Sequence, residues 1–78
     1  MELTEYQKNS LLVLMREYMK LKENALLPVL NEVISSIELG RVEDAYQARY
    51  IRDAIYSSED NKEKYKEFED SLVENFFN

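Results

Sequence analysis

Apolar residues recur at helical spacing along nearly the whole chain, and no segment shows the strict alternation of a half-buried strand. In the first segment, a rotation of about 100° per residue places the large apolar side chains on one half of a helix. These are Leu11, Leu12, Leu14, Met15, Tyr18, Met19 and Leu21. Thr4 and Gln7 have the spacing of a capping box, in which each side chain bonds the backbone of the other. The first helix is therefore expected to begin at Thr4.

A second helix is predicted from Ala25 or Pro28 to Glu38. Proline inside a helix removes a hydrogen bond and clashes with the preceding turn, so a new helix is favoured at Pro28. Its apolar stripe consists of Leu26, Val29, Leu30, Val33, Ile34 and Ile37. Gly40 follows the last periodic residue and can adopt the left-handed conformation that ends a helix. A tight turn is predicted around it.

A third helix is predicted from Val42 to Tyr56, with apolar residues on two faces. One face combines Ala45, Ala48, Ile51, Ile55 and Tyr56, and the other Val42, Tyr46 and Tyr50. Residues 57–61 have the composition of a cap and turn, with a second capping box expected between Asp60 and Glu63. If they stay helical instead, the third and fourth helices would form one rod of about 50 Å.

The last predicted helix extends from Asn61 to Phe76. Its stripe is Tyr65, Phe68, Leu72, Val73 and Phe76, and Phe77 lies off it. These patterns predict an all-α fold in one domain, residues 1–78: a bundle of three or four short amphipathic helices, or helical hairpins completed by a second copy. Because a domain this small buries only roughly 60 to 65% of the surface of its unfolded chain, we expect a homodimer or a protein partner to add stability.

The residue types needed for most chemistry near neutral pH are absent, since the chain has no histidine and no cysteine. A di-iron bundle would need Glu-x-x-His pairs. The acidic stretch 58–64 lacks the central glycine of a calcium loop, and Gly40 alone cannot make a phosphate-binding loop. We therefore expect no enzymatic activity, no catalytic residue, no cofactor and no metal.

The formal net charge is -6, and the acidity concentrates at the C-terminus, where residues 59–78 carry seven acids against three bases. Nucleic-acid phosphates favour basic surfaces, so direct nucleic-acid binding is not expected. The longest apolar run, residues 11–15, is far shorter than the about 20 residues that cross a bilayer, and no signal-peptide pattern is seen. The sequence predicts a cytoplasmic protein without membrane contact. Its richness in Lys, Asn, Tyr, Ile and Glu fits an AT-rich bacterial genome, and its size suits a phage or mobile-element product.

One candidate binding surface consists of Tyr46, Arg49, Tyr50 and Asp53. They are neighbours at helical spacing on the side of the third helix away from its main apolar stripe. Tyr and Arg are enriched where proteins bind one another, so this pattern indicates a face for a second copy or a foreign protein. The alternative is that Val42, Tyr46 and Tyr50 pack on another helix of the same bundle, with the tyrosine hydroxyls reaching solvent.

Phe77 is the second candidate for partner binding. Two rings at the end of an acidic helix could anchor in a groove of a partner, or could clamp the last helix onto its own core. The clamp is expected for Phe76, and both interpretations stay open for Phe77.

The sequence thus favours a non-catalytic helical protein, a small regulator, adaptor or inhibitor, that docks on a protein partner of unknown identity. One alternative is an acidic protein that imitates nucleic-acid phosphates and occupies the basic groove of a nuclease or DNA-binding protein. Another is a structural subunit of a larger assembly. Salt distinguishes the first two, because binding through carboxylates weakens steeply with ionic strength.

Overall fold

The computed structural model describes residues 1–78 and consists of helices joined by short turns. The elements are α1 (Glu5–Met19), the 3-10 turn η1 (Asn24–Leu26), α2 (Leu27–Glu38), α3 (Ala45–Ile55), α4 (Glu59–Lys64), α5 (Lys66–Leu72) and the π-helical turn η2 (Val73–Phe77). The all-α prediction is confirmed, with five α-helices instead of the three or four expected.

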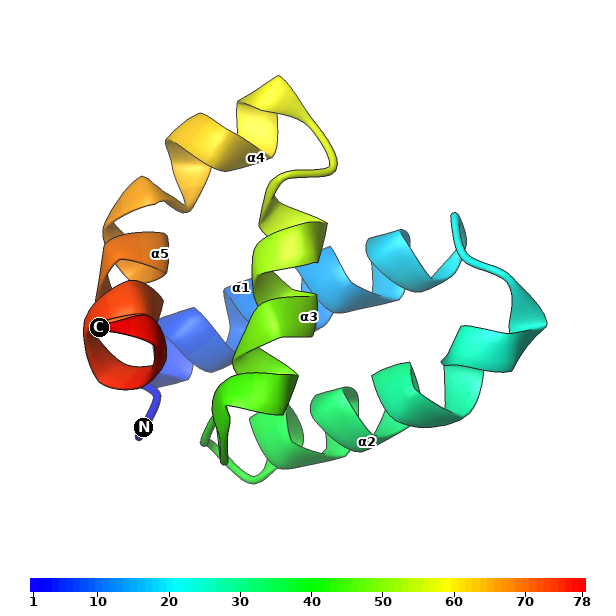
Figure 1. Cartoon of the computed structure of the whole chain (residues 1–78), viewed down its shortest axis with the longest axis horizontal. Helices are drawn as coiled ribbons and strands as arrows, with labels where there is room; N and C mark the ends of the chain where they lie inside the picture. The colour runs from blue at the N-terminus through cyan, green and yellow to red at the C-terminus, as the bar shows by residue number, and fades with distance from the viewer.

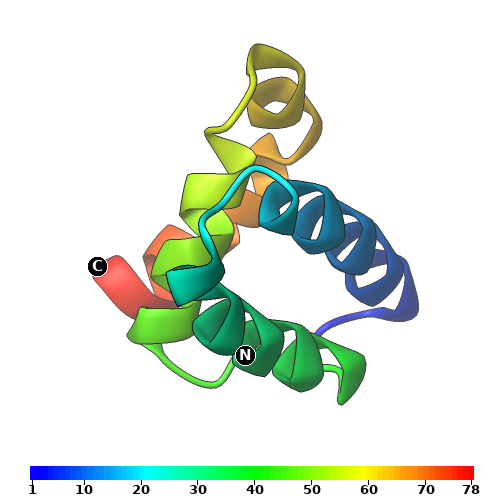
Figure 2. The same ribbon diagram turned by 90° about the vertical axis from the view of Figure 1, so that its right-hand side faces the viewer.

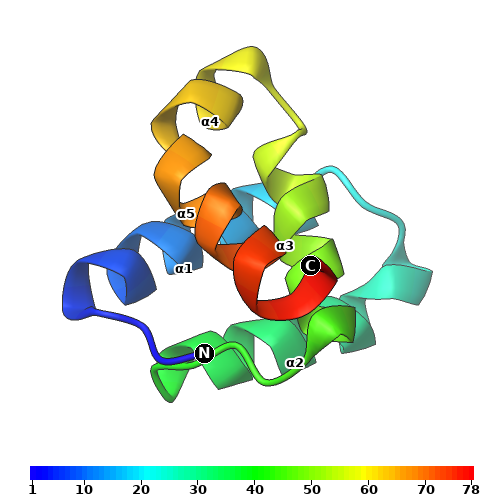
Figure 3. The same ribbon diagram turned by 60° about the vertical axis from the view of Figure 1, so that its left-hand side comes forward.

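Two antiparallel helices, α1 and α2, lie side by side, and α3 crosses both of them (Figure 1). Figure 2, turned by 90°, shows α1 and α2 as neighbouring coils. From the end of α3 the chain turns into α4, which projects away from the other helices. Helix α5 then returns toward α1, and η2 ends beside α3 (Figure 3).

The start of α1 is the predicted capping box. The Thr4 hydroxyl accepts a hydrogen bond from the Gln7 backbone N–H at 3.1 Å, and the Gln7 side chain accepts one from the Thr4 N–H at 2.9 Å. The helix ends at Met19, so Leu21 lies outside it and is exposed, which corrects the predicted stripe. The chain then reverses direction before α2 (Figure 1).

The predicted breaks at Pro28 and Gly40 are confirmed. Pro28 is in the first turn of α2, where its missing N–H would have no partner within the helix. Gly40 has a φ of +88°, in the left-handed region that glycine adopts at little steric cost. The predicted end at Glu38 is thus correct, and α2 begins at Leu27, one residue before the predicted restart at Pro28.

The amino-terminal residues pair with the segment that follows α2. The Leu3 N–H donates to the Gly40 carbonyl at 2.8 Å, and the Val42 N–H donates to the Met1 carbonyl at 2.9 Å. The Met1 amino group donates to the Val42 carbonyl at 2.9 Å. Val42 is buried in this segment and is not helical, so the prediction that the third helix begins there is wrong. Helix α3 begins three residues later, at Ala45.

The predicted last helix is broken at Tyr65 into α4 and α5, and α5 continues into η2. The Ser58 hydroxyl caps α4 by accepting the Asn61 N–H at 3.2 Å, so the capping box expected between Asp60 and Glu63 does not form. The single long rod does not form either. Helix α4 ends at Lys64, and the dihedral angles of its C-cap Tyr65 (φ -105°, ψ 15°) depart from the helix. This departure accompanies the burial of the Tyr65 ring against α1.

A single core of buried apolar residues joins the helices. It consists of Leu11, Leu14, Met15, Tyr18, Leu30, Val33, Ile34, Ile37, Val42, Ala48, Ile51, Ala54, Ile55, Tyr65, Phe68 and Leu72. Helix α4 contributes none of these side chains. Tyr56, predicted for the buried stripe of the third helix, is instead 48% exposed. None of the helices combines the length and apolarity needed to cross a membrane.

Candidate functional site

The first candidate site is the α3 face, which we define as Tyr46, Arg49, Tyr50 and Asp53. All four residues lie on α3, which is at the front of the molecule in Figure 1 with no other helix before it. Tyr46, Arg49 and Asp53 are exposed, and Tyr50 is partly buried. The structure therefore brings together the four residues that the sequence grouped.

The two tyrosines of the α3 face form an aromatic pair. Their ring centroids are 5.3 Å apart and their planes meet at 76°, an edge-to-face arrangement that aromatic quadrupoles favour. Tyr46 is 57% exposed, whereas Tyr50 packs against the core. Tyr50 thus packs within the bundle, as the alternative interpretation of these tyrosines predicts. The exposed ring of Tyr46 fits the interpretation of this surface as a binding face.

The adjacent Tyr46 side chain raises the pKa of Tyr50 above its ordinary value of 10.0. Desolvation and the nearby charge of Asp53 act in the same direction. Each of these influences disfavours the charged tyrosinate. The hydroxyl of Tyr50 is therefore a neutral group at physiological pH.

The two charged residues of the α3 face are not used within the chain. None of the ion pairs in the structure includes Arg49 or Asp53, although the two residues are four positions apart on one helix. Both side chains are exposed. The α3 face thus presents one free cation and one free anion beside an exposed aromatic ring.

Tyr56 adjoins the α3 face but was missed by the sequence reasoning. It is the C-cap of α3 and keeps right-handed dihedral angles (φ -79°, ψ 0°), so it continues the helical path. At about 100° per residue, Tyr46, Arg49, Asp53 and Tyr56 fall within an arc of about 80°. Their three-four-three spacing in the sequence is the signal that could have identified Tyr56.

Phe77, the other predicted partner-binding residue, lies apart from the α3 face in a cluster around Arg52. Its ring centroid is 5.1 Å from the Arg52 guanidinium carbon, and the ring packs against the core. Phe77 is the last residue of the π-helical turn η2 and packs against the core, although the sequence places it off the stripe. Phe77 is therefore partly buried against its own core, as the clamp interpretation predicts. That Phe77 also binds a partner stays a prediction.

Arg52 connects α3 to the C-terminal helices. Its Nε lies 3.0 Å from Glu69 Oε2, with side-chain exposures of 32% and 13%. The Nε–H makes no well-directed hydrogen bond, so the pair is held mainly by charge. The Arg52 Nη2 donates to the Tyr56 hydroxyl at 3.3 Å, and this hydrogen bond is the largest influence that raises the pKa of Arg52 further. Arg52 is thus a structural link.

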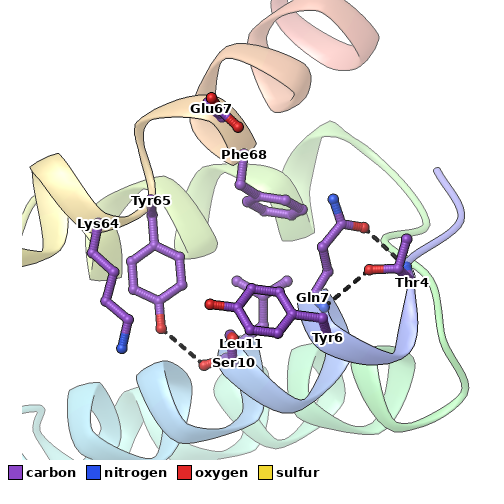
Figure 4. Close-up of a pocket in the computed structure, with 9 residues that line it drawn as sticks. All are labelled: Thr4, Tyr6, Gln7, Ser10, Leu11, Lys64, Tyr65, Glu67 and Phe68. Atoms are coloured by element: carbon purple, nitrogen blue, oxygen red, sulfur yellow. Dashed lines mark hydrogen bonds between the residues drawn. The ribbon is translucent and has the colours of Figure 1, made fainter.

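A cavity of about 230 Å³ lies between the start of α1 and the junction of α4 with α5 (Figure 4). The Tyr65 hydroxyl donates to the Ser10 carbonyl at 3.0 Å beside Leu11 and Phe68. Desolvation by burial raises the pKa of Tyr65 above its ordinary value of 10.0. The cavity is smaller than the about 300 to 1,000 Å³ of typical ligand sites. The sequence gives no local signal for it, because its walls come from opposite ends of the chain.

The acids of the C-terminal helices are partly neutralised by neighbours. Three of them form ion pairs: Glu59 with Lys62 at 3.2 Å, Asp70 with Lys66 at 3.4 Å, and Glu69 with Arg52 at 3.0 Å. No group of three or more acidic side chains is arranged to hold a metal ion. This surface stays acidic, because four of its seven acids form no ion pair, namely Asp60, Glu63, Glu67 and Glu74.

A scan of protein-family models finds no match to this chain, and searches of curated proteins and of solved structures find no significant similarity. Its function is therefore inferred from its own residues.

Proposed function

We propose that this chain is a non-catalytic helical protein that binds another protein through the α3 face. It would act as a small cytoplasmic regulator, adaptor or inhibitor, by occluding or stabilising its partner. The observation that carries the proposal is the combination of an exposed Tyr46 ring with an unpaired cation and an unpaired anion on one helix. The absence of histidine and cysteine supports a role in binding.

The α3 face has the properties of a binding hot spot. A tyrosine ring provides a large contact area and loses little conformational entropy when it is immobilised. The edge-to-face contact with Tyr50 already restricts the Tyr46 ring, so less order is lost on binding. Arg49 and Asp53 would add specificity, because a correct partner must offer the opposite charges at matching positions.

Self-association is part of this proposal. The core is enclosed within one chain, so a second copy would add contacts on an outer face. A small domain gains stability from such contacts by mass action. Dimerisation through the α3 face would therefore raise the melting temperature at high protein concentration.

The proposal is tested by capturing partners from the source cells with tagged protein. Tyr46 is the residue to change, because it is exposed, whereas loss of the Tyr50 ring would also disturb the core. We expect Tyr46→Ala with Arg49→Ala to lower the captured partner at least tenfold, at a melting temperature that is unchanged in dilute solution. Val13→Ala, which shortens an exposed side chain on α1, is the matched control. Equal capture by all variants would contradict the proposal.

A salt series separates this proposal from the imitation of nucleic acid. Binding through the tyrosines should change little between about 0.05 and 0.5 M salt, because burial of aromatic surface is not screened. A partner held by the carboxylates of residues 59–78 would be released over the same range. Replacing Glu63 and Glu67 by glutamine should leave capture unchanged if the α3 face is the site.

A further inference from the structure

We infer that the α3 face is built to pair with a second copy of this chain in an antiparallel, two-fold arrangement centred near position 51. This inference rests on the proposed use of the α3 face and names its partner. It depends on four exposed residues that we call the α3 seam, namely Tyr46, Arg49, Asp53 and Tyr56.

The α3 seam has the spacing of a helix-pairing stripe. Its intervals of three, four and three residues are those of heptad positions that face a partner helix. The buried residues of α3 lie on the opposite side, so the seam is free to meet another helix. Its ends are separated by about 15 Å along the axis, at about 1.5 Å per residue.

The order of side chains along the α3 seam is self-complementary. Read from either end, it is an aromatic ring, a charge, the opposite charge and an aromatic ring. Antiparallel pairing about position 51 places Arg49 against Asp53 of the second copy, and Asp53 against Arg49. It also places each Tyr46 against a Tyr56. Such mutual pairing of the same patch is the property of a two-fold interface.

Charge also selects the orientation. A parallel pair would set Arg49 against Arg49 and Asp53 against Asp53, and like charges across an interface are repelled. Only the antiparallel pair satisfies both charges, which have no partner within the chain. A surface for a foreign protein would not need this symmetry.

The aromatic ends of the α3 seam are held in place before pairing. The Tyr46 ring contacts the Tyr50 ring edge to face, with ring centroids 5.3 Å apart. The Tyr56 ring lies 5.5 Å from the Arg52 guanidinium carbon and 5.6 Å from the Lys62 amino nitrogen, and yet stays 48% exposed.

One three-turn helix buries less than the about 1,200 Å² of a standard stable interface, so we expect a dimer with a Kd of about 10 to 100 μM.

The experiment is sedimentation equilibrium of the full chain from about 5 μM to 1 mM, a range that brackets the expected Kd. Arg49→Asp and Asp53→Arg should each weaken self-association at least tenfold, because each sets like charges together. Mixing the two single variants should restore association, since a copy with two acids on its seam then meets a copy with two bases. The double variant R49D/D53R should also dimerise on its own, because it exchanges the two charges and keeps them complementary.

Matched controls change the net charge equally at other exposed positions. Lys20→Asp alters the charge as Arg49→Asp does, and Glu63→Arg alters it as Asp53→Arg does. Both controls should dimerise as the unchanged chain does. Circular dichroism melting checks that every variant folds, and the milder Arg49→Ala and Asp53→Ala replace any that does not.

Complementation between the two single variants supports the inference, and no foreign interface predicts it. A chain that stays monomeric up to about 1 mM, or single variants that dimerise normally, would overturn it. If the monomeric chain still loses a captured partner on Tyr46→Ala with Arg49→Ala, the proposed function stands and only the self-pairing fails.

Discussion

The two ends of the chain reach the folded state by different means. Helices α1 and α2 each bury four large apolar side chains along an uninterrupted stripe. The C-terminal region has α4, which buries none, and α5, which buries Phe68 and Leu72. The first region is therefore stabilised by a regular stripe of buried apolar side chains. The second depends on a few side chains that contact α1 and α3.

Two polar contacts fasten the C-terminal region. The Tyr65 hydroxyl donates to the Ser10 carbonyl, 55 positions away. The Arg52 guanidinium pairs with Glu69 at 3.0 Å, and Phe77 covers it. Because such contacts are few, a single substitution should loosen this region selectively.

The largest expected effect comes from Leu30→Ala in α2. Leu30 is fully buried, and truncation leaves a cavity that costs about 3 kcal/mol or more. Urea unfolding followed by circular dichroism should show loss of most of the free energy of unfolding.

Leu72→Ala makes the same change in α5 and should expose the C-terminal amides to hydrogen exchange while α1 and α2 stay protected. Equal loss of protection everywhere would show that the two regions unfold together.

Glu69→Gln should have the next largest effect. It removes one charge of the partly buried pair and leaves Arg52 uncompensated, so we expect a loss of about 1 to 2 kcal/mol in the free energy of unfolding. The matched control is Asp70→Asn, whose partner Lys66 is 3.4 Å away and well exposed. That change should cost less than about 0.5 kcal/mol. Similar values for both would mean that the Arg52 pair adds no special link.

Tyr65→Phe should lower the free energy of unfolding by about 1 kcal/mol, because the Ser10 carbonyl loses its donor. Tyr6→Phe, which alters an exposed tyrosine of the same cavity, is the control and should have almost no effect. The comparison uses thermal unfolding at neutral pH.

The same tyrosine gives a pH dependence with a defined sign. Burial raises the pKa of Tyr65 in the folded chain, so above the ordinary value of 10.0 the unfolded chain loses its proton first. The contribution of the neutral Tyr65 to the free energy of unfolding should therefore be fully present below pH 10 and should fall as the pH rises further. Tyr65→Phe should show a shallower fall in urea titrations over this range. An unchanged slope would contradict the assignment.

The smallest effects come from two helix caps. Thr4→Ala removes the hydroxyl that caps α1 and should cost about 1 kcal/mol. Ser58→Ala removes the cap of α4, but α4 buries no side chain and can fray at little cost. We expect less than about 0.5 kcal/mol in urea unfolding, with faster hydrogen exchange confined to α4. A larger global loss would show that α4 supports the core.

Local features of the fold could be predicted from the sequence, whereas distant contacts could not. Thr4, Pro28 and Gly40 act on their own turn of chain, so their roles follow from residue type and position. Val42 lies outside the helix and pairs with Met1, 41 positions away. The break at Tyr65 likewise accompanies a contact with Ser10. Neither partner is visible in a local pattern.

The same limit applies to the candidate site. Exposure of Tyr46, Arg49 and Asp53 follows from the rotation of side chains around a helix. The partial burial of Tyr50 and the exposure of Tyr56 depend on where the other helices cross α3. The position of Phe77 depends on the π-helical turn η2, and no residue type in this segment predicts such a turn.

Helix α4 has an evolutionary consequence. Since it inserts no side chain into the core, selection for packing leaves most of its surface residues unconstrained. Homologous chains could change its sequence, lengthen it or accept an insertion there without loss of the fold, because exposed segments tolerate such changes best. New recognition properties would arise most readily in this projecting arm.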